Sequence, residues 1–125
     1  MLKINPKKTE TKIVQEYLLS SVGPRPIALA STIDIKNIPN LSPFSFFNVF
    51  SGNPPILIFS PARRIRNNTE KDTLRNLKQV KEVVINIVSE DITKKMVKSS
   101  LDYDSDIDEF RESGLTHLQS DMIKP

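Results

Sequence analysis

Residues 37–62 contain no charged side chain, and this stretch constrains the fold more than any other feature of the sequence. An uncharged run of this length is long enough to cross a lipid bilayer as a helix. It also contains five prolines and many Asn and Ser residues, which would leave backbone and side-chain polar groups without partners in lipid. The stretch is therefore predicted to form short strands and turns of a folded domain rather than a membrane span.

The apolar runs around these prolines are short and separated by turn residues. Strands are predicted at residues 27–33, 40–44, 56–60 and 83–88. Helices are predicted at residues 9–22, after an N-cap at Asp72 or Thr73, from Ser89 to about Ser99, and in a last segment with an Asp106–Glu109 capping box and an end at Gly114. This pattern favours a small antiparallel β-barrel with peripheral helices over a doubly wound sheet. Four strands are too few to close a barrel unaided.

The scarce residue types exclude several classes of chemistry. The chain has no cysteine, a single histidine (His117) and three glycines. It therefore has no thiol nucleophile, disulfide or usual zinc site, and neither a GxGxxG fingerprint nor a P-loop. The formal net charge of +3 is too small to indicate nucleic acid by itself. The lack of a secretory signal and of cysteine predicts a cytoplasmic location.

The acidic residues at 102–109 suggest a metal site and His117 suggests a catalytic site, but the sequence supports neither interpretation. Acidic side chains recur over residues 102–109, but the EF-hand register would require glycine at Ile107 and glutamate at Ser113. A solvated acidic loop explains them better. No GxSxG motif accompanies His117, so no catalytic role is assigned to it.

An aromatic cluster and a basic segment each have two interpretations. The rings in residues 44–50 either belong to the core or, with Ser45 and Asn48 beside them, line a pocket for a flat heteroaromatic ligand. The basic segment, residues 63–81, is either a charged surface loop or an anion site in which Lys71 and Thr73 flank a helix start. Cations that would add charge-assisted hydrogen bonds there are Arg63, Arg64, Arg66 and Arg75. Nucleic acid ranks low as the anion, since no binding motif is present and the last third of the chain is acidic.

Several motifs occur in order over nearly the whole chain from residue 23. They are residues 23–32 (GPRPIALAST), 39–48 (PNLSPFSFFN), 53–60 (NPPILIFS), 71–77 (KDTLRNL), 83–89 (VVINIVS), 108–110 (DEF) and 114–116 (GLT). In composition and spacing this series resembles the flavin reductase-like, FMN-binding split-barrel family, which includes flavoredoxin-type proteins.

The resemblance implies one domain over residues 1–125, mainly β, forming the N-terminal part of an antiparallel split β-barrel with short flanking helices. It implies a homodimer that binds FMN near the interface and passes electrons from NAD(P)H to a flavin or another acceptor, such as a redox protein. Neither nucleic acid nor a membrane is an expected partner, and no metal or catalytic acid or base is expected. The implied FMN-binding residues are Ser31, Thr32, Phe44, Ser45, Phe46, Phe47 and Asn48 around the isoalloxazine, and Lys71, Asp72 and Thr73 at the phosphate.

The sequence departs from the family pattern at two points. Asn37 stands where glycine is common in the turn after the first strand, and Asn tolerates positive φ. The chain also stops where family members usually continue with further strands, so we expect a fragment of a longer protein or a truncated variant that pairs its open edges with another chain. Two alternatives to a reductase stay open: an FMN-binding electron carrier without its own NAD(P)H activity, and a flavin-free fragment with an assembly role.

Overall fold

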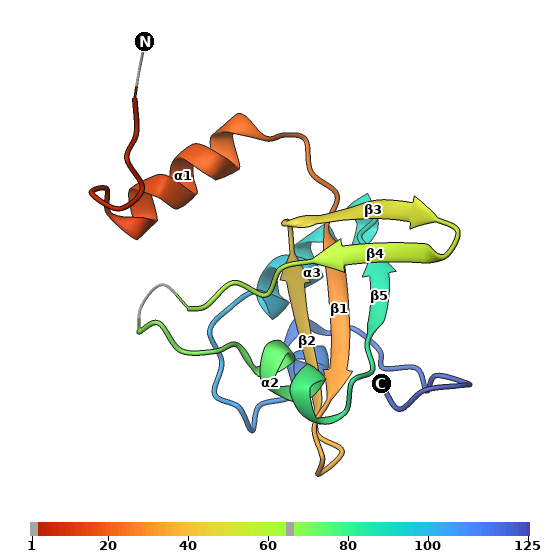
Figure 1. The fold of residues 1–125 in the computed structure, drawn as a ribbon. Helices are drawn as coiled ribbons and strands as arrows, with labels where there is room; N and C mark the ends of the chain where they lie inside the picture. The colour runs from red at the N-terminus through yellow and green to blue at the C-terminus, as the bar shows by residue number, and fades with distance from the viewer. Residues whose placement is uncertain (1–2, 65–66) are drawn as a thin grey trace.

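The computed structural model describes residues 3–64 and 67–125, which form two antiparallel sheets with flanking helices (Figure 1). The larger sheet has the order β2–β1–β5, with β1 (Ala28–Ile33) antiparallel to both β2 (Pro39–Phe44) and β5 (Val84–Ile87). All six residues of β1 are buried, as its unbroken run of small and apolar residues predicts. The predicted strands at 27–33, 40–44 and 83–88 are confirmed.

The second sheet is a hairpin of β3 (Phe47–Gly52) and β4 (Pro55–Phe59). Strand β4 was expected from the sequence, whereas β3 was not. Val49 pairs with Leu57 and Ser51 pairs with Ile56, so Phe50 is an extra residue in a bulge. The bulge breaks the alternation of apolar and polar side chains by which a strand is recognised in a sequence.

Helix α1 (Thr11–Ser21) stands apart from the two sheets in Figure 1, and none of its residues is buried. Arg25 joins it to the rest of the molecule. The guanidinium donates hydrogen bonds to the carbonyl groups of Leu19, at 2.7 Å, and of Val22, and it lies 5.9 Å from the ring centre of Phe46. The helix predicted at residues 9–22 is thus confirmed, but it contributes little to the core.

The remaining helices cover both faces of the larger sheet. Helix α2 (Asp72–Gln79) contacts β1 and β2. A 3-10 turn (Glu90–Ile92), α3 (Thr93–Ser99) and α4 (Glu109–Ser113) follow β5. Leu29 of β1, Leu41 of β2 and Met96 of α3 form the buried hydrophobic core, against which Phe110 of α4 packs. Because side chains alternate along a strand, Thr32 points to the other face and contacts α2.

Two predicted helix caps are wrong by a few residues. The N-cap of α2 is the extended residue Lys71, rather than Asp72 or Thr73. The N-cap of α4 is Asp108, whose carboxylate accepts the backbone N–H groups of residues 110 and 111, rather than Asp106. Gly114 ends α4 with φ 71°, as predicted.

The uncharged stretch at residues 37–62 forms β2, β3, β4 and their turns. Asn37, in the turn before β2, has φ 64°, the left-handed conformation for which Asn is suited. Among the residues that the structure describes, no helix has the length and apolar character needed to span a bilayer.

Candidate functional site

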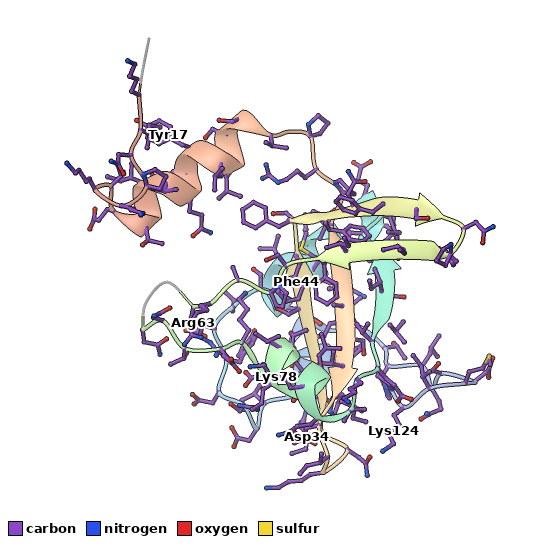
Figure 2. The ribbon with its side chains drawn as sticks, in the orientation of Figure 1. Tyr17, Asp34, Phe44, Arg63, Lys78 and Lys124 are labelled. Atoms are coloured by element: carbon purple, nitrogen blue, oxygen red, sulfur yellow. The ribbon has the colours of Figure 1, made fainter. Side chains whose placement is uncertain are left out.

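A cavity of about 380 Å³ opens where the end of β2, the start of α2 and the segment between α3 and α4 meet. Figure 2 shows Phe44 on the sheet side of this region and Arg63 on the loop that leads toward α2. The cavity is lined by Gln15, Leu19, Asn40, Ser42, Pro43, Phe44, Ser45, Phe46, Ser60, Ala62, Arg63, Arg64, Lys71, Asp72, Thr73, Ser99, Ser100, Leu101, Asp102, Tyr103 and Glu109. Segments far apart in the sequence thus place aromatic, cationic and acidic side chains around one hollow.

The cavity brings together six of the residues that the resemblance assigns to FMN binding. These are Phe44, Ser45, Phe46, Lys71, Asp72 and Thr73. Ser31 instead lines a second cavity, while Thr32 is fully buried against α2. Phe47 is buried and Asn48 is exposed on β3, and neither lines the cavity. For all ten residues, a contact with flavin stays a prediction.

The second cavity, also of about 380 Å³, lies between β1, β5 and the segment that follows α4. Leu29 and Leu41 contribute to its wall, as does His117. The His117 ring packs edge-on against Phe110, with 5.2 Å between ring centres. Within residues 3–64 and 67–125 no cluster of acidic and histidine side chains could hold a metal ion.

Arg64 is committed to partners within the chain. Its Nε donates to Asp102 at 3.0 Å, its Nη2 to Asp72 at 2.8 Å, and its Nη1 to the carbonyl of Glu70. Burial disfavours the charge, but the bonds to the two carboxylates outweigh burial and keep the pKa of Arg64 above its ordinary value. Asp72 also pairs with Arg75 at 2.7 Å. The carboxylate of Asp72 therefore binds these two arginines and holds the loop before α2 to the helix.

The other predicted cations differ in the hydrogen-bond and salt-bridge partners that they have within the chain. Arg63 is exposed, and its Nε donates to the backbone carbonyl and the side-chain oxygen of Asn68. Arg66 lies outside the described residues. Lys71 is half-buried and, among the described residues, its ammonium forms no salt bridge with a carboxylate.

Lys71 occupies a position suited to an anion. Its Nζ lies 5.3 Å from the ring centre of Phe44. Burial lowers the pKa of Lys71 and the charge of Arg64 lowers it further, while the charge of Asp102 opposes them only in part, so an anion placed here would offset the remaining shift. Lys71 is also the N-cap of α2, where the first-turn N–H groups of Asp72 and Thr73 have no acceptor within the helix. The ammonium, the open N–H groups and the helix dipole together favour phosphate.

A buried polar network beneath Lys71 was not anticipated from the sequence. The hydroxyl of Thr73 donates to Asn40 Oδ1 at 2.8 Å, and Asn40 Nδ2 donates to Glu109 Oε1 at 2.5 Å. The other carboxylate oxygen, Oε2, accepts the N–H of Leu41 at 3.2 Å. The sequence motif indicated only a helix start for Glu109. Its burial depends on α4 packing beside β2, for which no local signal exists.

The comparisons with known proteins agree with this fold. The model of the flavin reductase like domain family matches residues 20–124. An uncharacterized protein of Aquifex aeolicus is 40% identical over 118 residues, which cover 94% of this chain and 60% of the relative.

Two solved structures resemble the chain closely. Nitrilotriacetate monooxygenase component B from Bacillus cereus has a TM-score of 0.90 at 29% identity, covering 99% of this chain and 60% of its own. A putative flavin reductase with a split barrel domain from Shewanella frigidimarina has a TM-score of 0.74 at 29% identity, covering 92% and 56%. The chain thus spans 56–60% of the length of these three proteins. The chain has the antiparallel sheets and flanking helices of the split-barrel structures, and the family model matches most of its residues. The chain therefore belongs to the flavin reductase-like domain family.

Proposed function

We propose that the cavity at the start of α2 binds FMN, with the phosphate at Lys71 and the first-turn N–H groups of α2. The observation that carries this proposal is the half-buried ammonium of Lys71, which faces the cavity without a salt bridge among the described residues. Partial burial of a cation without a salt bridge is costly, and an anionic ligand offsets that cost. Family membership supports a flavin as the source of this anion.

The rest of the cavity wall suits the apolar part of such a ligand. Phe44 and Phe46 supply aromatic surface, and Ser45 between them supplies a hydroxyl and backbone polar groups. The ring of Phe44 is held by Phe59 of β4, with 5.2 Å between ring centres. Bound FMN supplies hydride and electron transfer, while these residues position it and exclude water.

We further propose that the whole protein is an oxidoreductase that moves electrons from NAD(P)H through FMN to a flavin or another acceptor. Two neighbours support this class, because their names describe a monooxygenase component and a putative flavin reductase. The alternative is an FMN-binding carrier that receives electrons from a protein partner. NAD(P)H oxidation by the FMN-loaded protein separates the two, since the carrier would bind FMN without oxidising NADH or NADPH.

We also propose that the protein works as a homodimer. The hairpin β3–β4 supports this, because Val49 and Phe50 are each 64% exposed and Leu57 and Ile58 are each 49% exposed. Apolar surface of this kind is usually covered by a partner or by further chain. Analytical ultracentrifugation tests the proposal, and a monomer at every concentration would refute it for this chain.

The binding proposal is tested by titrating FMN and riboflavin, which differ by the phosphate. Lys71→Ala is expected to weaken FMN binding about tenfold or more by removing a charge-assisted contact, while riboflavin binding changes little. Lys78→Ala is the matched control, since this exposed lysine of α2 is paired with Glu70. Equal FMN affinity in the Lys71 variant and the wild type would place the phosphate elsewhere.

A further inference from the structure

We infer that Glu109 is a positioning residue for the anion subsite, and that through Asn40 it decides whether the hydroxyl of Thr73 offers its proton to a bound anion. The inference deepens the proposed function, because it concerns the same cavity and rests on an anion binding at the start of α2. Glu109 itself is placed beneath that subsite, where its carboxylate bonds Asn40 and the backbone of β2.

The geometry of the network sets the direction of its hydrogen bonds. Asn40 lies in the middle, with its Nδ2 donating to Glu109 and its Oδ1 accepting two hydroxyls, from Thr73 at 2.8 Å and from Thr32 at 3.3 Å. Asn40, Thr32 and Thr73 are all buried, with exposed fractions of 8% or less. An ionised carboxylate only accepts hydrogen bonds, so it holds the Asn40 amide with nitrogen toward Glu109 and oxygen toward the threonines.

In this arrangement the hydroxyl of Thr73 donates no hydrogen bond to an anion in the cavity. Its single hydroxyl proton is directed to Asn40, so only lone pairs of that oxygen are left to face the cavity. Lone pairs repel a phosphate or sulfate oxygen. While Glu109 is ionised, the subsite therefore depends on Lys71 and the backbone N–H groups alone.

When Glu109 takes up one proton, the hydrogen bonds that join it through Asn40 to the threonines can reverse direction. No donor then faces another donor. The protonated carboxyl donates from its O–H to the Asn40 oxygen after the amide rotates by half a turn. The two hydrogens of the rotated Nδ2 then meet the hydroxyl oxygens of Thr32 and Thr73, which accept them. Thr73 is left free to turn its own proton toward the cavity. Asn76 donates to Thr32 at 3.3 Å, and its Oδ1 is buried without a partner among the described residues. If the amide of Asn76 also rotates by half a turn, its oxygen accepts the hydroxyl proton of Thr32.

The charges around Glu109 are compatible with proton uptake. Asp72 of α2 faces it across the cavity, together with Asp102 and the cations Arg64 and Lys71. On the side of the β1–β2 turn, Asp34 and Arg75 line a small hollow with it. Burial raises the pKa of Glu109, and the negative charge of Asp72 raises it further, against the opposing bonds from backbone N–H groups and Asn40.

The experiment measures anion binding together with its proton uptake. Sulfate is the first probe, because its charge stays constant over the range used, and FMN is the second. Calorimetric titrations at about pH 5 and about pH 8, each in two buffers of different ionisation enthalpy, give both the affinity and the protons bound. We expect sulfate to bind with proton uptake, and about tenfold more tightly at the lower pH, the size of one charge-assisted hydrogen bond.

Two variants separate the network from simple charge repulsion. Glu109→Gln imitates the protonated side chain, so affinity at the higher pH should rise toward the low-pH value and proton uptake should vanish. Thr73→Val keeps the shape and removes the hydroxyl, so proton uptake should fall sharply although Glu109 still titrates. Glu112→Gln, an exposed glutamate of the same helix, is the control and should behave as the wild type.

Unchanged proton uptake in Thr73→Val would overturn the inference, since repulsion between Glu109 and the anion would then suffice. Unchanged uptake in Glu109→Gln would assign the proton to another group and overturn it as well. If sulfate behaves as expected and FMN does not bind, the inference stands and the proposed function fails. If FMN binds at Lys71 without the linkage, the proposed function stands and the inference fails.

Discussion

The central strand β1 and the hairpin β3–β4 are both antiparallel and rich in apolar residues, yet they differ sharply in exposure. Every residue of β1 is buried, because strands flank both its edges and helices cover both its faces. In the hairpin, Val49 and Leu57 are paired across the strands and are still 64% and 49% exposed. Apolar sequence therefore predicts that a strand forms, but its burial depends on what lies against it.

The candidate site lies beside both regions: its lining includes Phe44 at the end of β2, the neighbour of β1, and Phe46 and Ser60, which flank the hairpin. The buried residue Phe44 ends β2, Phe47 begins the hairpin, and Phe44 contacts Phe59 at the end of the hairpin. The site thus has one side made by β2 and the start of α2, and an aromatic side next to the hairpin, where Phe46 precedes β3 and Phe44 contacts Phe59. Changes in the two regions should therefore have different consequences for folding.

The largest expected difference is between core truncations in the two regions. Leu41→Ala should lower the free energy of unfolding by about 4 kcal/mol, because Leu41 is 1% exposed and leaves a cavity. Val49→Ala should cost less than about 1 kcal/mol in a monomer. Urea unfolding followed by circular dichroism measures both, and equal losses would mean that the hairpin is covered in solution.

The next effect concerns the ion pairs that hold the loop before α2 to the core. Asp72→Ala should cost about 3 kcal/mol, because it leaves the largely buried Arg64 with one carboxylate fewer. Glu70→Ala removes a surface pair with Lys78 and should change stability much less, because solvent screens such pairs. Thermal and urea unfolding of the two variants test this ranking. A larger loss of stability in the Glu70 variant than in the Asp72 variant would contradict it.

A smaller effect tests the cap of α4, the helix that places Glu109. Asp108→Ala should cost about 1 kcal/mol, since the carboxylate caps two N–H groups. Asp106→Ala should leave the unfolding midpoint within experimental error, although the sequence motif suggested Asp106 as the cap. The outcome that contradicts the structure is a larger loss in the Asp106 variant.

The smallest expected effect is a pH dependence of stability that comes from Glu109. Burial raises its pKa, so between the ordinary value and the raised value the folded chain holds a proton that the unfolded chain has released. The free energy of unfolding should therefore fall as pH rises through that window. Glu109→Gln should remove this part of the fall in unfolding curves measured over a pH series, whereas Glu112→Gln should keep it.

Much of the fold, and the position of Lys71 at the start of α2, was predictable because the signals are local. Prolines and turn residues delimit the strands on either side of them, and the charge change after residue 62 marks the segment that leads into α2. Lys71 was identified from its place before a helix, even though the N-cap is one residue earlier than predicted. The strand β3 was missed because the bulge at Phe50 disrupts its alternation.

Local sequence signals placed most of the strands, turns and helices, with β3 as the exception, because proline, glycine and apolar periodicity act on neighbouring residues. The sequence also indicated the family, since the motifs recur in order. Packing between separate segments pairs Arg64 with carboxylates, leaves Lys71 at the cavity, and buries Glu109, which is linked to Thr73 through Asn40. These outcomes depend on contacts between segments dozens of residues apart, and burial and charge pairing are set by such contacts rather than by the local sequence.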